Sequence, residues 1–141
     1  TGPAGGNNAS AISSYALLGN LSISPISTSV PTFGAATCWL AVTPNGRFVY
    51  TSNAGTSTIS SFAIGPNGGL SPLAGTILAS LPAGSGNLDV AISADGRFLY
   101  SLDSGAGAVS IFGIGEDGSL DALGEITNLR AASGLNGIAA F

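Results

Sequence analysis

Asp89 and Trp39 are the two side chains in this sequence whose types and positions most favour chemistry with a ligand. They occupy the same place in two copies of an internal repeat, each at the start of a β-prone run. A carboxylate such as Asp89 can act as a general base, a metal ligand or an anchor for a sugar hydroxyl. The indole of Trp39 offers a large rigid face and one hydrogen-bond donor. The alternative roles are structural, with Asp89 bonding backbone amides and Trp39 packing between sheets.

Cys38 is the single cysteine, which excludes an internal disulfide and every multi-cysteine metal site. The chain contains neither histidine nor lysine, so it offers no partner of those types to activate the thiol. We therefore expect Cys38 to be an inert buried residue rather than a nucleophile. The sequence predicts neither a cofactor site nor a metal site.

Two pairs of polar residues recur in both copies of the repeat. Asn53 and Asp103 follow the second β-prone run of each copy, where Asx side chains commonly bond the following loop. Arg47 and Arg97 directly follow Asx-Gly pairs, and two arginines can grip a carboxylate or a phosphate. Because each residue type returns at the same place in both copies, we predict that all four belong to the scaffold.

The acidic residues near the C-terminus form a small cluster, consisting of Glu116, Asp117, Asp121 and Glu125. Calcium binding is one interpretation, since hard cations take several oxygen ligands. We favour a solvated edge that blocks strand-to-strand association. Residues 113–118 match the pattern G-x-G-x-x-G, but they lack a strand-to-helix context, and their two acids would repel a pyrophosphate. We interpret this match as an ordinary turn.

Composition narrows the class of protein. Hydrophobic residues make up 45% of the chain, charged residues only 7%, and the net charge is −4. An acidic chain does not favour nucleic acid, and no apolar stretch approaches the roughly 20 residues that span a membrane. Low charge with abundant Ser, Thr, Gly and Asn is typical of secreted proteins, so we expect an extracellular or periplasmic location. Two sequons, at Asn8 and Asn20, leave glycosylation open.

The positions of these residues follow from a repeat. Residues 41–73 recur as residues 91–123, with the same Gly-Arg-Phe-x-Tyr core. Asx-Gly pairs separate short β-prone runs in both copies, and we expect them to form type I′ turns in which both central residues have positive φ. The predicted strands are residues 39–43, 48–52, 58–64 and 70–77 in one copy, and residues 89–93, 98–102, 108–114 and 120–126 in the other.

Four antiparallel strands in a unit of this length make one blade of a β-propeller. We predict an all-β fold, a β-propeller segment of four-stranded antiparallel blades with two complete blades and two partial ones. Ile12 aligns with Ile59 and Tyr15 with Phe62, so the chain starts within a blade, and residues 21–26 supply a fourth strand. The inner strands that line the channel are predicted at residues 39–43, 89–93 and 136–141.

The chain accordingly divides into four parts. We expect a partial blade and connection at residues 1–37, blades at residues 38–86 and 87–132, and the first strand of a further or ring-closing blade at residues 133–141. So few blades cannot close a ring of the usual four to eight. We expect the exposed edges to associate with the remaining blades of the same propeller or with further copies of this chain.

The repeat resembles the lactonase-type seven-bladed propellers, also called the YVTN or 6-phosphogluconolactonase-like family. The segments that carry the resemblance are CWLAVTPNGRFVYTSNAGTSTISSFAI at residues 38–64 and NLDVAISADGRFLYSLDSGAGAVSIFGI at residues 87–114. The closing LNGIAAF, residues 135–141, is similar to the C-terminal strand of such proteins. The resemblance covers nearly the whole chain and implies that it is the C-terminal portion of a propeller.

Two functions follow from the resemblance. The family includes enzymes that open lactone rings and others that close them on muconate, together with secreted propellers that have no assigned reaction. The muconate-type relatives use His, Glu and Arg in the channel, and this chain has no His. The first hypothesis is a complete propeller that hydrolyses a lactone or related ester, with Asp89 and Trp39 lining the pocket. The alternative is a non-catalytic propeller that binds a glycan, a protein or copies of itself.

Overall fold

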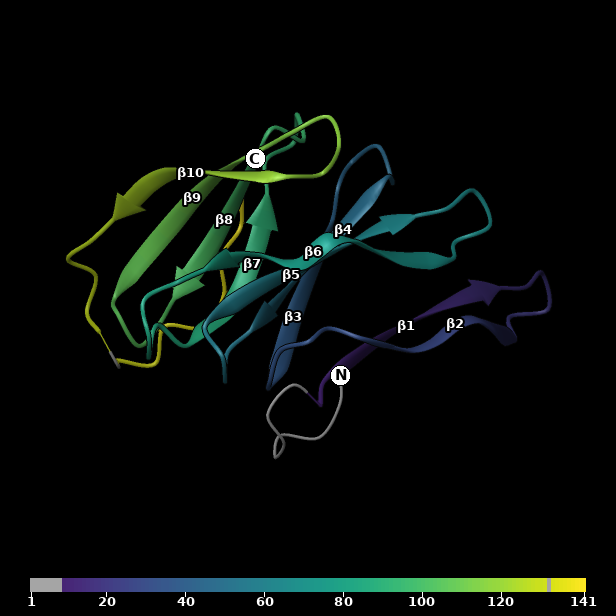
Figure 1. The fold of residues 1–141 in the computed structure, drawn as a ribbon, viewed down its shortest axis with the longest axis horizontal. Helices are drawn as coiled ribbons and strands as arrows, with labels where there is room; N and C mark the ends of the chain where they lie inside the picture. The colour runs from purple at the N-terminus through teal and green to yellow at the C-terminus, as the bar shows by residue number, and fades with distance from the viewer. Residues whose placement is uncertain (1–8, 132) are drawn as a thin grey trace.

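The computed structural model describes residues 9–131 and 133–141, which form ten strands in three antiparallel sheets (Figure 1). The first sheet pairs β1 with β2, the second runs β3-β4-β5-β6, and the third runs β7-β8-β9-β10. The all-β prediction of four-stranded antiparallel blades is confirmed. The strands are Ala11–Leu17, Ile23–Pro31, Thr37–Val42, Phe48–Asn53, Thr58–Ile64, Leu70–Ser80, Asn87–Ile92, Phe98–Asp103, Ala108–Ile114 and Leu120–Ile126.

The predicted strands of the two complete sheets lie where strands are observed. Residues 58–64, 108–114 and 120–126 coincide with β5, β9 and β10 at both ends. The innermost strands β3 and β7 begin two residues earlier than predicted, at Thr37 and Asn87. A register shift after each of these residues lets the chain continue pairing along its neighbour, as a bulge does.

The Asx-Gly turns differ from the predicted type I′ geometry, and that prediction is wrong. In each turn only the glycine has a positive φ, between 71° and 84°. At the first turn the Gly46 amide donates to the Thr43 carbonyl oxygen at 2.8 Å, which closes a type I turn with Pro44 and Asn45 at its centre. The Asn45 side-chain oxygen accepts from the Arg47 amide at 3.0 Å, so the Asx residue caps the turn.

The second sheet is packed on both faces, because successive side chains of a strand point to opposite sides. Towards the third sheet lies one buried cluster, made of Phe48, Tyr50, Ile59, Ala79, Val90, Leu99 and Phe112. Towards the first sheet lies a smaller cluster, made of Ile12, Val49 and Phe62. Each fully buried large side chain contributes about 1.5–3 kcal/mol, so these two clusters hold the sheets together.

Tyr50 fixes the third sheet against the second by a hydrogen bond. Its hydroxyl donates to the Gly118 carbonyl oxygen at 3.0 Å, in the turn between β9 and β10. Burial, with a smaller effect of the Asp117 charge, raises the pKa of Tyr50 to about 12. A Cβ atom on Gly118 would lie less than 3.0 Å from side-chain atoms of Phe48 and Leu73, so the close approach requires glycine there.

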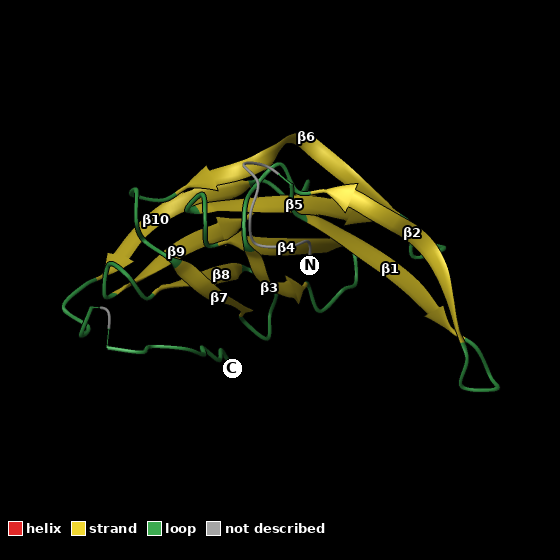
Figure 2. Ribbon diagram, turned by 90° about the horizontal axis from the view of Figure 1, so that it is seen from below, coloured by secondary structure: helices red, strands yellow, loops and turns green. Residues whose placement is uncertain are grey.

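The three sheets follow one another along an arc (Figure 2). The outer strands β2, β6 and β10 lie on its convex side, and β3, β7 and the C-terminus lie on its concave side. β3 and β7 contact each other across the second and third sheets. This is the arrangement of consecutive propeller blades, with one edge strand of each complete sheet on the concave side.

The predicted inner strand at residues 136–141 is not formed, and this expectation is corrected. These residues follow an extended course without strand pairing. A strand needs a hydrogen-bonded neighbour, and none of the described strands pairs with these residues. The segment nevertheless lies beside β7, because the Ile138 amide donates to the Asp89 carboxylate at 2.9 Å.

Candidate functional site

Trp39 and Asp89 lie at equivalent places on the two inner strands, as the repeat predicts. Each follows the bulge near the start of its strand, Trp39 opposite Ser52 and Asp89 opposite Leu102. Their surroundings are very different, since Trp39 is 53% exposed and Asp89 is 4% exposed. At this equivalent position the second sheet therefore has an exposed aromatic side chain, and the third sheet has a buried carboxylate.

Both carboxylate oxygens of Asp89 accept backbone hydrogen bonds. Oδ1 accepts from the Val90 amide at 2.7 Å, and Oδ2 accepts from the Ile138 amide at 2.9 Å. Charge-assisted bonds of this kind are roughly twice as strong as neutral ones. The carboxylate thus holds the C-terminal segment against β7, and its role towards a ligand stays a prediction.

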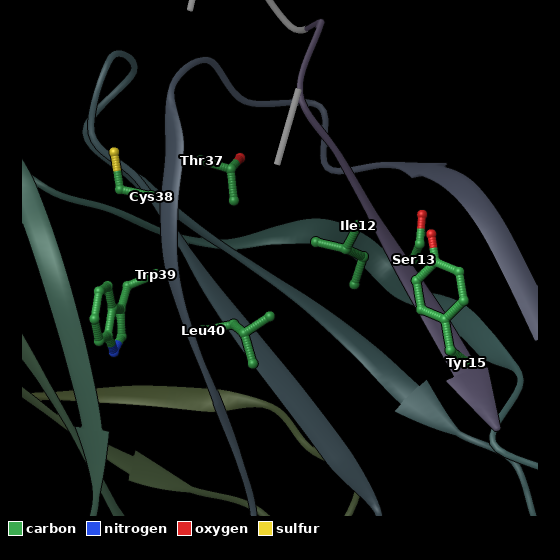
Figure 3. A pocket seen from close by; sticks show the side chains of 7 residues that line it. All are labelled: Ile12, Ser13, Tyr15, Thr37, Cys38, Trp39 and Leu40. Carbon is green, nitrogen blue, oxygen red and sulfur yellow. The ribbon is translucent and has the colours of Figure 1, made fainter. Parts of the chain in front are cut away.

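Trp39 borders a cavity of about 500 Å³ between β1 and β3 (Figure 3). In Figure 3 the Ile12 side chain projects from β1 towards β3, Leu40 projects from β3 towards β1, and Trp39 lies on the other side of β3. The cavity is lined by Ile12, Ser13, Tyr15, Thr37, Cys38, Trp39 and Leu40. Its walls combine apolar and aromatic side chains with the hydroxyls of Ser13 and Thr37.

Cys38 is exposed, so the expectation that it is buried is wrong. The register shift between Thr37 and Trp39 interrupts the alternation of the strand and leaves Cys38 on the uncovered side of β3. Its thiol donates to the Ala36 carbonyl oxygen at 3.1 Å. No group of three or more His, Cys, Asp or Glu residues gathers within the described ranges.

Asn53 and Asp103 are buried where the second strand of each complete sheet ends. The Asn53 amide donates to Thr58 Oγ1 at 3.0 Å and to Ser60 Oγ at 2.8 Å. Asp103 accepts instead, from Ser101 Oγ at 2.9 Å and from Ser110 Oγ at 2.6 Å. These bonds tie neighbouring strands of one sheet together, which accords with the predicted structural role.

Burial is the largest influence on the Asp103 carboxyl, and it raises the pKa of Asp103 above the ordinary value. The hydroxyls of Ser110 and Ser101 oppose this, because they donate to the ionised form, and the Glu125 charge adds slightly to the rise. Asn53 performs the same bridging in the second sheet without a charge. The third sheet thus carries a buried acid at a place where the fold needs only a hydrogen-bonding side chain.

Arg47 and Arg97 lie on the surface of the scaffold, away from Trp39. Arg47 Nη2 donates to the Glu116 carbonyl oxygen at 3.2 Å, and Nη1 lies 3.9 Å from the Glu116 carboxylate. Each guanidinium also lies over the ring that follows it in sequence, at 5.1 Å over Phe48 and 5.4 Å over Phe98. Residues 113 and 114 end β9, and residues 115–119 form the turn to β10, so the glycine pattern there is no phosphate loop.

Tyr15 and Leu40 were not predicted from the sequence as site residues. The repeat alignment relates both residues to buried ones, since Leu40 aligns with Val90 and Tyr15 aligns with Phe62. Both are about half exposed, and both line the cavity beside Trp39. The alignment does not show which face of a sheet packs against a neighbouring sheet.

The comparisons with known proteins agree with this geometry. The arrangement of the three sheets shows the class of protein, which is a segment of a β-propeller. The chain matches the family model described as "Lactonase, 7-bladed beta-propeller" over residues 6–136, and it belongs to that family. The recognition made from the repeat is therefore confirmed. No curated protein sequence matches the chain.

Three solved structures share the fold. A functionally unknown protein from Desulfotomaculum acetoxidans is 16% identical, with a TM-score of 0.71 over 89% of this chain and 38% of its own. A putative 6-phosphogluconolactonase from Bacteroides fragilis is 19% identical, with a TM-score of 0.69 over 86% of this chain and 39% of its own. The periplasmic gluconolactonase of Pseudomonas aeruginosa is 22% identical, with a TM-score of 0.69 over 90% and 38%.

The chain thus spans less than two fifths of the length of each of these proteins. Nowhere in the described part of the chain does a helix have the length and apolar character that crossing a membrane requires. The sequon at Asn20 lies in the exposed turn between β1 and β2, and the one at Asn8 lies outside the described residues.

Proposed function

We propose that this chain contributes part of a lactonase-family propeller whose complete ring hydrolyses a sugar lactone. The observation that carries the proposal is the family match over residues 6–136. Two structural neighbours, a gluconolactonase and a putative 6-phosphogluconolactonase, indicate the substrate class. The remaining blades would supply the catalytic groups that this chain lacks.

The reaction adds water to an ester. The water oxygen bonds to the lactone carbonyl carbon, the bond from that carbon to the ring oxygen breaks, and the ring oxygen leaves with a proton as a hydroxyl. The product is an open-chain hydroxy acid. A general base must take a proton from water, and hydrogen-bond donors must stabilise the carbonyl oxygen as it becomes negative.

Trp39 is the residue of this chain best placed to bind the substrate. It is about half exposed on an inner strand, where its ring can cover the apolar face of a lactone. Asp89 would act as a positioning residue, because its two oxygens hold backbone amides beside the channel side of β7. A stacked aromatic contact contributes about 0.5–1.5 kcal/mol beyond the area that it buries.

The test is lactone hydrolysis by the complete propeller, followed as acid release from glucono-δ-lactone. We predict turnover above the spontaneous rate, and for Trp39→Ala a KM about tenfold higher with a kcat changed less than threefold, as loss of about 1.4 kcal/mol of binding implies. Leu123→Ala, on the exposed outer strand β10, is the matched control and should leave both constants unchanged. A complete ring that does not exceed the spontaneous rate would contradict the proposal.

A second candidate is a non-catalytic propeller that acts as a binding or self-assembling module. It is favoured by the inner strand β3, where Trp39, Leu40 and Val42 are each about half exposed. Exposed apolar surface of this kind is typical of an interaction site. The same experiment separates the two candidates, because a module of this kind would bind a lactone, a glycan or a protein without turnover.

An extracellular or periplasmic location is part of the proposal. The low charge of the chain supports it, and one of the structural neighbours is the periplasmic gluconolactonase of Pseudomonas aeruginosa. Fractionation of cells that express the complete propeller tests this, with the cytoplasmic fraction as the contrary result.

A further inference from the structure

The hairpin of β1 and β2 carries a cluster of exposed apolar side chains at its turn, which we call the hairpin tip. The tip consists of Leu17, Leu18, Leu21 and Ile23, whose residues are between 45% and 82% exposed. Figure 2 shows this turn projecting beyond the end of the arc, away from the other two sheets. Contiguous exposed apolar side chains of this kind mark a surface that contacts a protein or a membrane.

Packing between sheets does not explain a leucine at this turn. The three outer turns share one hydrogen-bond pattern, in which Leu21 takes the place of Gly68 and Gly118. A Cβ atom on Gly118 would lie less than 3.0 Å from side-chain atoms of Phe48 and Leu73 in the second sheet. A sheet packed equally closely against the hairpin tip would overlap the Leu21 side chain in the same way.

Leu21 also lowers the stability of the fold. Its φ of 64° lies in the left-handed region, which glycine adopts freely and leucine does not. Leu18 likewise stands where the second and third sheets have Gly65 and Gly115. Strained residues cluster at sites that bind a ligand or a partner. The two leucines therefore indicate a contact outside the sheets.

Several polar groups of the hairpin tip are paired within the turn. The Leu18 amide donates to the Ser22 carbonyl oxygen at 2.9 Å, and the Leu21 amide donates to the Leu18 carbonyl oxygen at 2.8 Å. Asn20 Oδ1 accepts from the Ser22 amide at 3.1 Å and from the Ser22 hydroxyl at 2.6 Å. Because these groups already have partners, the tip loses less free energy when it leaves water for an apolar medium.

The surroundings of the hairpin tip are uncharged, because no charged side chain precedes Arg47 in the sequence. No ionised side chain of the first sheet would therefore lose its hydration in lipid, and no basic residue there would select anionic lipids. Tyr15 is about half exposed on β1, two residues before Leu17 and thus roughly 7 Å along the strand. Tyrosine is enriched where lipid headgroups meet the acyl chains.

We propose that the hairpin tip inserts into the surface of a lipid membrane, with its leucines among the acyl chains and Tyr15 at the level of the headgroups. Peripheral proteins bury apolar side chains about 5–10 Å deep in this boundary, which matches the distance from Leu17 to Tyr15. A second copy of this chain fits less well, since a stable interface buries about 1,200 Å² or more and the tip of one hairpin offers too little area. The proposal is independent of lactone hydrolysis.

The test is flotation of the purified chain with phosphatidylcholine vesicles. We expect the chain to float with the vesicles, and neither high salt nor added phosphatidylglycerol should strengthen binding. Leu18→Ser combined with Leu21→Gly should lower the partition coefficient about a hundredfold, about tenfold for each leucine. Leu21→Gly relieves strain, so unfolding would not explain this loss. The matched control is Leu123→Ser with Ile126→Ser on β10, two residues that are about as exposed and should leave binding unchanged.

A second measurement locates the contact at the turn. Trp39 is the single tryptophan, so Leu18→Trp in a Trp39→Phe background places the only indole at the hairpin tip. Its emission should move to shorter wavelength when phosphatidylcholine vesicles are added. An unchanged emission would overturn the proposal, and so would equal flotation of the native chain and the tip variant. A native chain that does not float would also overturn it, in favour of an apolar protein surface as the partner.

Discussion

At the scale of single residues, the contrast between Asn53 and Asp103 shows how one fold position tolerates two chemistries. Both side chains are fully buried and bridge the same strands, one by donating and the other by accepting. Burying the uncharged amide costs less free energy of desolvation than burying a carboxylate. The ionised acid is the less favourable choice at neutral pH.

Asp103→Asn should stabilise the chain by about 1 kcal/mol at pH 7. Because the folded-state pKa of Asp103 is raised, its contribution to stability is greatest below the unfolded pKa and is lost as the pH rises through the folded pKa. The advantage of the variant should therefore shrink as the pH falls through the folded-state pKa and be gone below the unfolded value of 3.8. Urea unfolding at pH 7 and at pH 3.5 measures both values.

The matched control is Asn53→Asp, which should destabilise the chain at pH 7, because it buries a charge where Thr58 and Ser60 now accept from an amide. A loss of stability in Asp103→Asn at pH 7 would show that the hydroxyls of Ser101 and Ser110 compensate the buried charge.

The sequence predicted the positions of the candidate residues better than their surroundings. The repeat placed Trp39 and Asp89 correctly on equivalent inner strands. It could not show that Asp89 is engaged by the Ile138 amide or that Cys38 is exposed. Those properties depend on which neighbour packs over each strand, and a pattern within one strand contains no such information.

At the scale of elements, the three outer hairpins have turns of one geometry but different sequences. Gly68 and Gly118 have φ values of 81° and 84° in the second and third sheets, and Leu21 has a φ of 64° in the first. Each of these three amides donates to the carbonyl oxygen three residues before it, at 2.8–2.9 Å. A leucine in the left-handed region costs about 1–2 kcal/mol, so Leu21 is strained.

Leu21→Gly should raise the free energy of unfolding by about 0.5–1 kcal/mol, because relief of the strain exceeds the added entropy of an unfolded glycine. Leu21 is 82% exposed, so its side chain buries little apolar area. Thermal unfolding of the two proteins gives the comparison. A lower Tm would mean that the leucine makes contacts that outweigh its strain.

Gly118→Leu is the contrasting variant at the equivalent turn. A side chain there would overlap Phe48 and Leu73, and we expect a loss of at least 2 kcal/mol. An equal response of the two turns would contradict the view that neighbouring sheets decide which turn requires glycine.

Strand positions were predictable because alternation and turn residues mark them directly, as at β5, β9 and β10. The turn type was not, since Asx-Gly fits both a type I′ turn and a type I turn that ends in glycine. Residues 136–141 have the sequence of a β-strand, but they form none because no described strand pairs with them.

At the scale of the whole molecule, the chain is an arc of one half sheet and two complete sheets (Figure 1). The family has seven blades, and the chain spans under two fifths of three solved relatives. An arc exposes a blade face at each end. At the face beside β1, Leu40 and Val42 are about half exposed.

Native mass spectrometry of the purified chain tests this account most directly. If a ring requires blades that this segment does not contain, the purified chain should form no closed homo-oligomer of fixed stoichiometry. A single symmetric oligomer would contradict the account, because copies of the chain would then complete a ring by themselves.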